Sequence, residues 1–395
     1  MSTQDERHAA CRLRRRARTL RLFPSHALQR LLTRHARDCA ELGLRLNGLA
    51  AEDDAVVHAW LRARSNLLPL GLAVDLERID DLATNRGAAA LVEAARRAGA
   101  DFRSLGLDAL EVSARAFLDN REVFEAAHGR HVIETLRGTT EFAGRRAGPA
   151  ARFGDAQVRM LEADLGRQFD ARARSAHCRI TVGAHEDRLV FTVAHGAMVH
   201  ADEALDERPM VVADGDGPVY LDDRAVRYRP MRRDVVVYEA GAGRLRIRAS
   251  DAPTKRAYRR AFGELLMGDA EWFGSGPIVS LEPLSRLGRA VQVPTPGLRE
   301  VRVVGLVLEH AEPHGKMALD ADEIWPYLDG NLVYGLAGAV IHSVVFRMFA
   351  AGSSTGTRVT LKVPNDVLYN GLPDDVVRPF LEERGLLARA EGDAP

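Results

Sequence analysis

Two histidines and an aspartate, His195, His200 and Asp202, lie within eight residues of one another. Two imidazoles and a carboxylate can bind a metal ion or act as a general acid and base. The interval of five between the histidines is not the i, i+4 spacing of a helical zinc pair, and on a strand it places the two rings on opposite faces. These residues are the catalytic candidates of the sequence; the alternative is that they are surface histidines or histidines whose hydrogen bonds are satisfied by ordinary partners.

A second motif, Gly352–Gly356, matches the GxSxG pattern of a nucleophile elbow and would make Ser354 a nucleophile. That turn needs a strand before it and a helix after it. Here a strand-type run begins at Thr357, and the last histidine, His342, precedes the serine rather than following it. We therefore interpret Ser354 as part of a hairpin loop.

Further His and Glu residues cluster between Glu309 and His314, just before Gly315 and Lys316. A phosphate-binding loop is excluded because Met317, not Ser or Thr, follows the lysine. No HExxH, CxxC or helix-opening GxGxxG motif occurs. The sequence thus indicates no metal and no cofactor, and it leans against an enzyme. The alternative is a metal-assisted hydrolase or nuclease built on the His/Asp cluster.

Charge is segregated along the chain although 55 basic and 55 acidic residues give no net charge. Residues 1–48 carry eleven arginines and four carboxylates, and residues 224–260 carry twelve basic residues and three carboxylates. Between them, residues 200–223 carry eight carboxylates and one arginine. Basic faces bind phosphates or an acidic partner, whereas the alternative is a solvated face or pairing with the acidic block.

We therefore predict a non-enzymatic nucleic-acid-binding or assembly and regulatory subunit of a multi-protein system. Only three of the 55 basic residues are lysines, which favours a bacterial, GC-rich genome. The partner would be DNA or RNA, an acidic protein, or both, with no membrane. The predicted phosphate contacts are Arg14, Arg18, Arg21, Lys255, Arg256, Arg259 and Arg260.

Apolar residues recur at helical spacing from about residue 6 to 173, which predicts an all-helical first half. The predicted helices include 74–83, 86–98, 107–127 and 155–173. From His177 the pattern changes to β-branched runs around polar turns, which predicts hairpins at 179–193, 211–221 and 234–248. A helix should then run from Asp251 to Met267, with Tyr258, Ala261, Phe262 and Leu265 buried and the basic residues outward. The stretch 277–296 reads as irregular, and 340–349 with 357–363 as a last hairpin.

The predicted fold class is α+β. A helical domain (1–150) leads through a connecting helix (151–176) to a mainly antiparallel β domain with inserted and terminal helices (177–395), and the Gly/Pro-punctuated stretch 144–154 is the expected linker. Apolar residues at 46% and charged residues at 28% are typical of globular proteins. No secretory signal or run of roughly 20 apolar residues is found. Three scattered cysteines, without a disulfide framework, favour the cytoplasm.

Overall fold

The computed structural model describes most of the chain. The described residues are 23, 25–41, 43–44, 57, 68–100, 106–136, 138–148, 154–172, 174–185, 187–197, 200–204, 224–228, 231–310, 315–326, 328, 339–369 and 371–388. The predicted hairpin at 211–221 and the arginines Arg14, Arg18 and Arg21 lie outside them. Among the described residues, no helix is both long and apolar enough to cross a bilayer.

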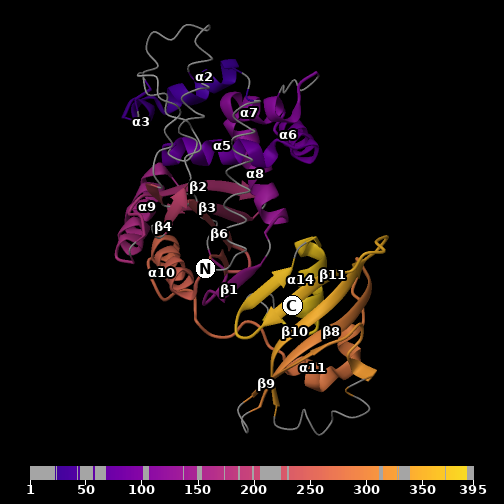
Figure 1. Cartoon of the computed structure of the whole chain (residues 1–395). Coiled ribbons are helices and arrows are strands. Elements are labelled where there is room, and N and C mark those ends of the chain that lie inside the picture. Colours follow the sequence, from indigo (N-terminus) through magenta and orange to yellow (C-terminus); the bar gives the residue numbers. More distant parts are fainter. Residues whose placement is uncertain are drawn as a thin grey trace, which may run out of the picture.

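The first described part of the chain is a layer of packed helices (Figure 1). These are α2 (Ser25–Arg34), α3 (Ala36–Glu41), α5 (Leu70–Leu82), α6 (Asn85–Arg97), α7 (Ala109–Asp119) and α8 (Arg121–Glu134). Polar caps set the starts of α6 and α7, because Thr84 accepts from the Gly87 amide and Asp108 from the Glu111 amide. The single helix predicted at 107–127 is instead two helices, since Asn120 leaves the helical conformation and its side chain caps α8.

The remainder is dominated by a ten-stranded antiparallel sheet in the order β2-β3-β6-β7-β1-β12-β11-β10-β8-β9. The strands are β1 (Thr139–Ala143), β2 (Cys178–His185), β3 (Arg188–Gly196), β6 (Met231–Glu239), β7 (Arg244–Arg248), β8 (Leu298–His310), β9 (Gly315–Asp320), β10 (Ala339–Ala350), β11 (Thr357–Lys362) and β12 (Asp366–Tyr369). The chain is therefore a mixed helix and strand protein. The predicted hairpins at 179–193, 234–248 and 340–363 are confirmed by the β2–β3, β6–β7 and β10–β11 pairings.

Strand β1 corrects the prediction of an all-helical first half. Its five residues lie in the middle of the sheet, between β7 and β12. Phe142 pairs with Leu245 on one side, and Thr139 pairs with Val367 on the other. The strand was missed because it is short and its pairing partners are more than a hundred residues away. Any domain division must therefore leave Thr139–Ala143 with the sheet; the boundaries themselves stay a prediction.

Helices cover both faces of the first half of the sheet. On one face, α9 (Asp155–Asp170) and α10 (Ala252–Met267) pack on Phe191, Val236 and Tyr238. On the other, Val132 and Ile133 of α8 pack on Val190, Val235 and Val237. Neighbouring residues of a strand point to opposite faces, so the two cores lie on opposite sides. Helix α14 (Asp374–Glu383) packs on the second half of the sheet, where its Val377 and Phe380 join Val344, Phe346 and Val367.

The sequence prediction was wrong for part of the stretch 277–296 and right for helix α10. The stretch 277–296 is not irregular throughout, because α11 (Glu282–Leu287) and a 3₁₀-helix (Gly288–Gln292) form within it, α11 starting with Pro283 in its first turn. The helix predicted to end at Gly268 is confirmed. Asp251 caps the start of α10, and Gly268 has a φ of 69°, a left-handed conformation that favours glycine.

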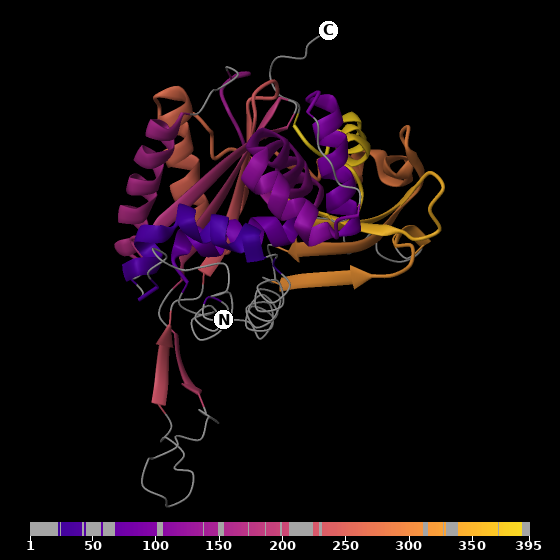
Figure 2. The same cartoon turned by 90° about the horizontal axis from the view of Figure 1, so that it is seen from above.

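A separate two-stranded sheet is formed by β4 (His200–Ala204) and β5 (Arg224–Tyr228). It continues the β3–β6 pair. The β3–β6 ladder ends at the pair Gly196–Met231, and the β4–β5 ladder runs from His200–Tyr228 to Ala204–Arg224. Figure 2 shows these two strands projecting away from the body of the molecule. We call β4 and β5 the arm.

Candidate functional site

His195, the first catalytic candidate, is fully buried in a polar network beneath α10. Its Nε2 lies 3.0 Å from Asp234 Oδ2, and the Tyr258 hydroxyl donates to the same oxygen at 2.9 Å. The Phe169 ring stacks on the imidazole with centroids 4.4 Å apart. Burial and the Asp234 charge raise the pKa of Tyr258 well above its usual value, so the hydroxyl stays a proton donor.

The His195–Asp234–Tyr258 network has the group types of an acid–base triad but an environment that suits packing. His195 and Tyr258 are 0% exposed, and Asp234 is 5% exposed. The network joins β3, β6 and α10, and it gives the buried Asp234 carboxylate two hydrogen-bonding partners. His200 and Asp202 lie on β4 of the arm, beyond the end of the β3–β6 ladder. The structure therefore assigns His195 to the core, apart from the strand that carries the other two candidates.

A second buried histidine joins the helical layer to the sheet. Asp81 Oδ2 on α5 lies 3.3 Å from His128 Nε2 on α8 and 2.5 Å from Arg233 Nη1 on β6. Burial lowers the pKa of His128 to about 4, opposed by the Asp81 carboxylate and reinforced by Arg78. Burial alone would raise the pKa of Asp81, but Arg233 and His128 lower it below its usual range. Asp81 is thus ionised and His128 neutral near pH 7.

A large charged cluster spans the middle of the sheet, on the face that carries α14. We call it the seam network. Its members come from β1, β3, β6, β7, β12 and α14, and they are Glu141, Arg188, Glu239, Arg244, Arg246, Tyr369, Asp374, Arg378 and Glu382. Four arginines face four carboxylates, so the formal charges balance.

Glu141 of β1 is the centre of the seam network and is 0% exposed. It accepts a hydrogen bond from Arg378, and Arg246 Nε and Arg244 Nη1 lie 3.5 and 3.8 Å from its oxygens. Asp374 is bound by Arg246 and by the Tyr369 hydroxyl. Burial would raise the pKa of Asp374, but Arg246 and Arg378 lower it below its usual range. The network therefore holds its charges fixed, which suits a structural role better than proton transfer.

Helix α10 carries the predicted phosphate contacts, and most of them have acidic neighbours. Lys255 Nζ lies 3.6 Å from Asp366, and Arg259 and Arg260 lie 2.9 and 3.4 Å from the two oxygens of Glu271. Arg259 is only 9% exposed, which corrects the expectation that it points outward. The predicted apolar stripe is confirmed at Tyr258, Ala261 and Phe262, with Leu265 half-buried.

Arg256 differs from the other α10 cations. Its side chain is exposed, and no acidic partner is found for it among the described residues. Arg260 is also 63% exposed despite its contact with Glu271. These two residues are the part of the predicted basic face that remains open to an anion.

The remaining motifs give no catalytic arrangement in the described part of the chain. Ser354 is exposed in the loop between β10 and β11, as predicted. Glu309 pairs weakly with Lys316 at 3.8 Å, whereas Glu312 and His314 lie outside the described residues. No group of three His, Cys, Asp or Glu side chains that could hold a metal is found among the described residues.

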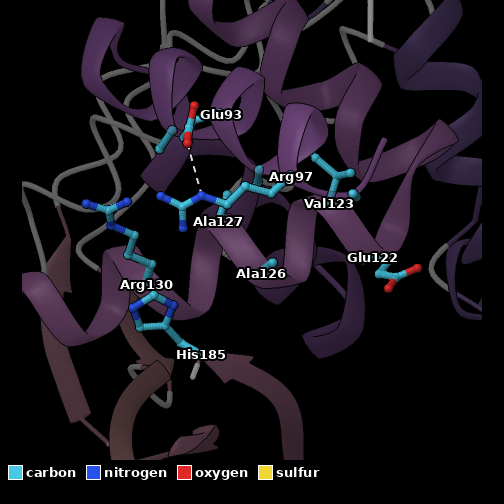
Figure 3. Close-up of a pocket in the computed structure, with 11 residues that line it drawn as sticks. Glu93, Arg97, Glu122, Val123, Ala126, Ala127, Arg130 and His185 are labelled. Carbon is cyan, nitrogen blue, oxygen red and sulfur yellow. Dashed lines mark hydrogen bonds and ion pairs between the residues drawn. The ribbon is translucent and has the colours of Figure 1, made fainter. Parts of the chain in front are cut away.

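Two hollows on the described surface are lined mainly by helix residues. One, of about 230 Å³, lies between α6 and α8 (Figure 3). Its two arginines are already engaged, because Arg97 contacts Glu93 at 3.0 Å and Arg130 contacts Glu134 at 2.8 Å. The other, of about 340 Å³, includes Arg30 and Arg115, both paired with Asp119. Neither contains His195 or a member of the seam network.

No protein-family model matches this chain, and no curated protein sequence matches it either. Function must therefore be argued from its own residues. Sequence analysis missed Glu141, Asp81 and Asp374, because their partners are brought together only by the fold. Glu141, for example, lies between Thr140 and Phe142, with no adjacent basic residue in the sequence that would mark its role.

Proposed function

We propose that this protein is a non-enzymatic assembly subunit of a multi-protein system, and that the arm is the part that contacts a partner. The observation that carries this proposal is the continuation of the β3–β6 ladder into β4–β5, which pair only with each other in the described structure. At roughly 3.3 Å per residue, each five-residue strand adds about 16 Å of ribbon beyond the sheet.

The energetics of such a ribbon favour a binding role. An isolated two-stranded hairpin is marginally stable in water, because it has little apolar surface to bury. β4 contains His, Ala, Asp, Glu and Ala, and β5 contains two arginines, so neither strand has a run of large apolar residues. A partner surface would supply the packing that the ribbon lacks.

The polar networks of the body support the non-enzymatic part of the proposal. The His195–Asp234–Tyr258 network, the Asp81 cluster and the seam network each bring charged or polar groups of different elements into contact. Such perturbed groups also occur in active sites, but there they line a cleft. Neither of the two hollows described above contains a residue of these three networks.

The test removes the arm and leaves the body intact. Residues 198–229 are replaced by Asn-Gly, which leaves a four-residue loop between Gly196 and Met231. We expect thermal unfolding to change by only a few degrees, because the sheet strands are untouched. The tagged full-length chain, after mild cross-linking in its own cells, should recover partner proteins in a fixed ratio. The arm-deleted chain should no longer recover them.

The matched control shortens a different hairpin in the same way. Replacing residues 351–356 by Asn-Gly leaves a four-residue loop after the Met348–Thr357 pair and does not touch the arm. This variant should retain the partner proteins. If the arm-deleted chain retains them as well, or if the chain shows metal-dependent hydrolysis, the proposal is wrong.

A second candidate function, phosphate binding by α10, is favoured by the exposure of Arg256 and Arg260. This candidate keeps the predicted binding of nucleic acid but assigns it to fewer residues. Lys255 and Arg259 support it less, because each already forms an ion pair with an acidic side chain.

A further inference from the structure

Strand β9 forms one edge of the ten-stranded sheet and pairs only with β8 in the described structure (Figure 2). Its exposure alternates along the strand. Lys316, Ala318 and Asp320 are exposed, whereas Met317 and Leu319 are half-buried and Leu319 packs against the core. An edge strand offers unpaired backbone groups to another strand.

The backbone groups at this edge can be assigned from the β8–β9 register. The Ala321 amide donates to the Val304 carbonyl at 3.0 Å, and Leu306 and Leu308 lie opposite Leu319 and Met317. In an antiparallel ladder the N–H and C=O groups of one residue point to the same side, and this side alternates along the strand. The groups of Lys316, Ala318 and Asp320 therefore point away from β8.

We infer that β9 pairs with β9 of a second copy of this chain, antiparallel, across a two-fold axis at Ala318. This register pairs the outward groups of Lys316 with those of the partner's Asp320, and those of Ala318 with the partner's Ala318. It also places each Lys316 side chain opposite a carboxylate and each Met317 opposite the partner's Leu319. The sequence Lys-Met-Ala-Leu-Asp is thus complementary to itself when reversed.

Other registers satisfy fewer groups. A shift by one residue would direct outward groups onto backbone that already bonds β8, and a shift by two would lose both Lys–Asp pairs. A parallel arrangement would place Lys316 opposite Lys316. Opposite charges facing each other across strands stabilise the pairing, and like charges destabilise it.

The charges of β9 are available for this contact. Lys316 lies 3.8 Å from Glu309, and Asp320 lies 3.8 Å from Arg358, with all four side chains at least half exposed. Exposed ion pairs of this kind contribute little to stability. A charged edge normally prevents pairing with unrelated strands. Here the same charges exclude other strands and admit a copy of the chain, which goes beyond the proposed role of the arm and does not depend on it.

The test measures the mass of the full chain over a concentration series by light scattering and sedimentation. We expect a change from the 43.3 kDa monomer to twice that mass. Lys316→Asp or Asp320→Lys alone makes both symmetric pairs like-charged and should weaken the dimer about tenfold or more. An equimolar mixture of the two variants should form dimers again, because one strand then carries two acids and the other two bases.

A backbone variant provides the second measurement. Ala318→Pro removes the amide on the two-fold axis, which points away from β8, so the monomer should fold with an unchanged far-UV spectrum and thermal midpoint. It should remain a monomer at every concentration tested. A wild-type chain that stays monomeric, a dimer that survives Ala318→Pro, or single variants that do not recover on mixing would each overturn the inference.

Discussion

The buried His195 lies 3.0 Å from Asp234, a carboxylate that also accepts a hydrogen bond from the Tyr258 hydroxyl. The sequence grouped His195 with His200 and Asp202, whereas Asp234 and Tyr258 are 39 and 63 residues further along the chain. Nothing local in the sequence identifies such partners. The neighbouring Val193 and Ala194 belong to the core, and His195 is buried with them.

His128 leads to a prediction about pH. The pKa of about 4 in the folded protein is below the ordinary histidine value near 6.5, so the unfolded chain binds more protons between these values. Stability should therefore be highest above pH 6.5 and fall as the pH is lowered toward 4. Between pH 7 and pH 5 the loss from this residue should be about 2 kcal/mol.

The measurement is urea unfolding at several pH values between 5 and 7. His128→Gln keeps an N–H near Asp81 but cannot bind a proton, so its stability should depend less on pH than that of the wild-type chain. His26→Gln, at an exposed position, is the matched control and should leave the dependence unchanged. Equal pH dependence in His128→Gln and wild type would contradict the assignment.

At the element scale, locally encoded features were predictable and long-range ones were not. Asp251, Pro253 and Gly268 define α10 from within its own sequence, and the structure agrees. Strand β1 has no such signal, because five residues of Thr, Glu, Phe and Ala become a central strand only when β7 and β12 flank them. The break at Asn120 lies between these cases, since asparagine is a good cap but the apolar pattern continues across it.

The proposed phosphate binding concerns one face of α10. Arg256→Glu combined with Arg260→Glu should weaken the binding of both single- and double-stranded oligonucleotides. If both residues contact phosphates, the slope of log K against log salt should become shallower by about 0.7–0.9 per contact. A salt-titrated fluorescence anisotropy series on single- and double-stranded oligonucleotides measures this slope.

The control for α10 makes the same change of charge elsewhere. Arg286→Glu with Arg299→Glu alters two exposed arginines away from α10. This variant should keep the wild-type slope. An equal loss in both double variants would indicate a general effect of net charge, and an unchanged slope in the α10 variant would leave its cations with a structural role.

At the scale of the whole molecule, one short strand connects the two halves of the sheet. β2, β3, β6 and β7 lie on one side of β1, and β12, β11, β10, β8 and β9 lie on the other (Figure 1). β1 precedes the other nine strands in sequence but lies between the two halves in space. The sheet is therefore continuous only when residues 139–143 pair with β7 on one side and with β12 on the other. The mixture of helices and antiparallel strands was predictable from the change of period near His177, whereas this closure was not.

The seam network should make the two halves unfold together. Glu141 of β1 contacts Arg244 and Arg246 of the first half and Arg378 of α14 on the second. Removing one member of a buried ion network leaves uncompensated charges and costs about 3–5 kcal/mol. We expect Glu141→Gln to lower the free energy of unfolding by this amount, because the amide keeps the shape of the side chain but leaves three guanidinium groups facing a neutral partner.

Glu382→Gln is the matched comparison within the same network. Glu382 also contacts Arg244, at 3.4 Å, but its side chain is 30% exposed, so water replaces the lost charge. Its substitution should cost less than about 1 kcal/mol. Calorimetry and urea titration of both variants separate the two cases. A Glu141→Gln chain as stable as Glu382→Gln would mean that β1 joins the halves by backbone pairing alone, whereas a much larger loss with a single transition places the coupling in the buried charges.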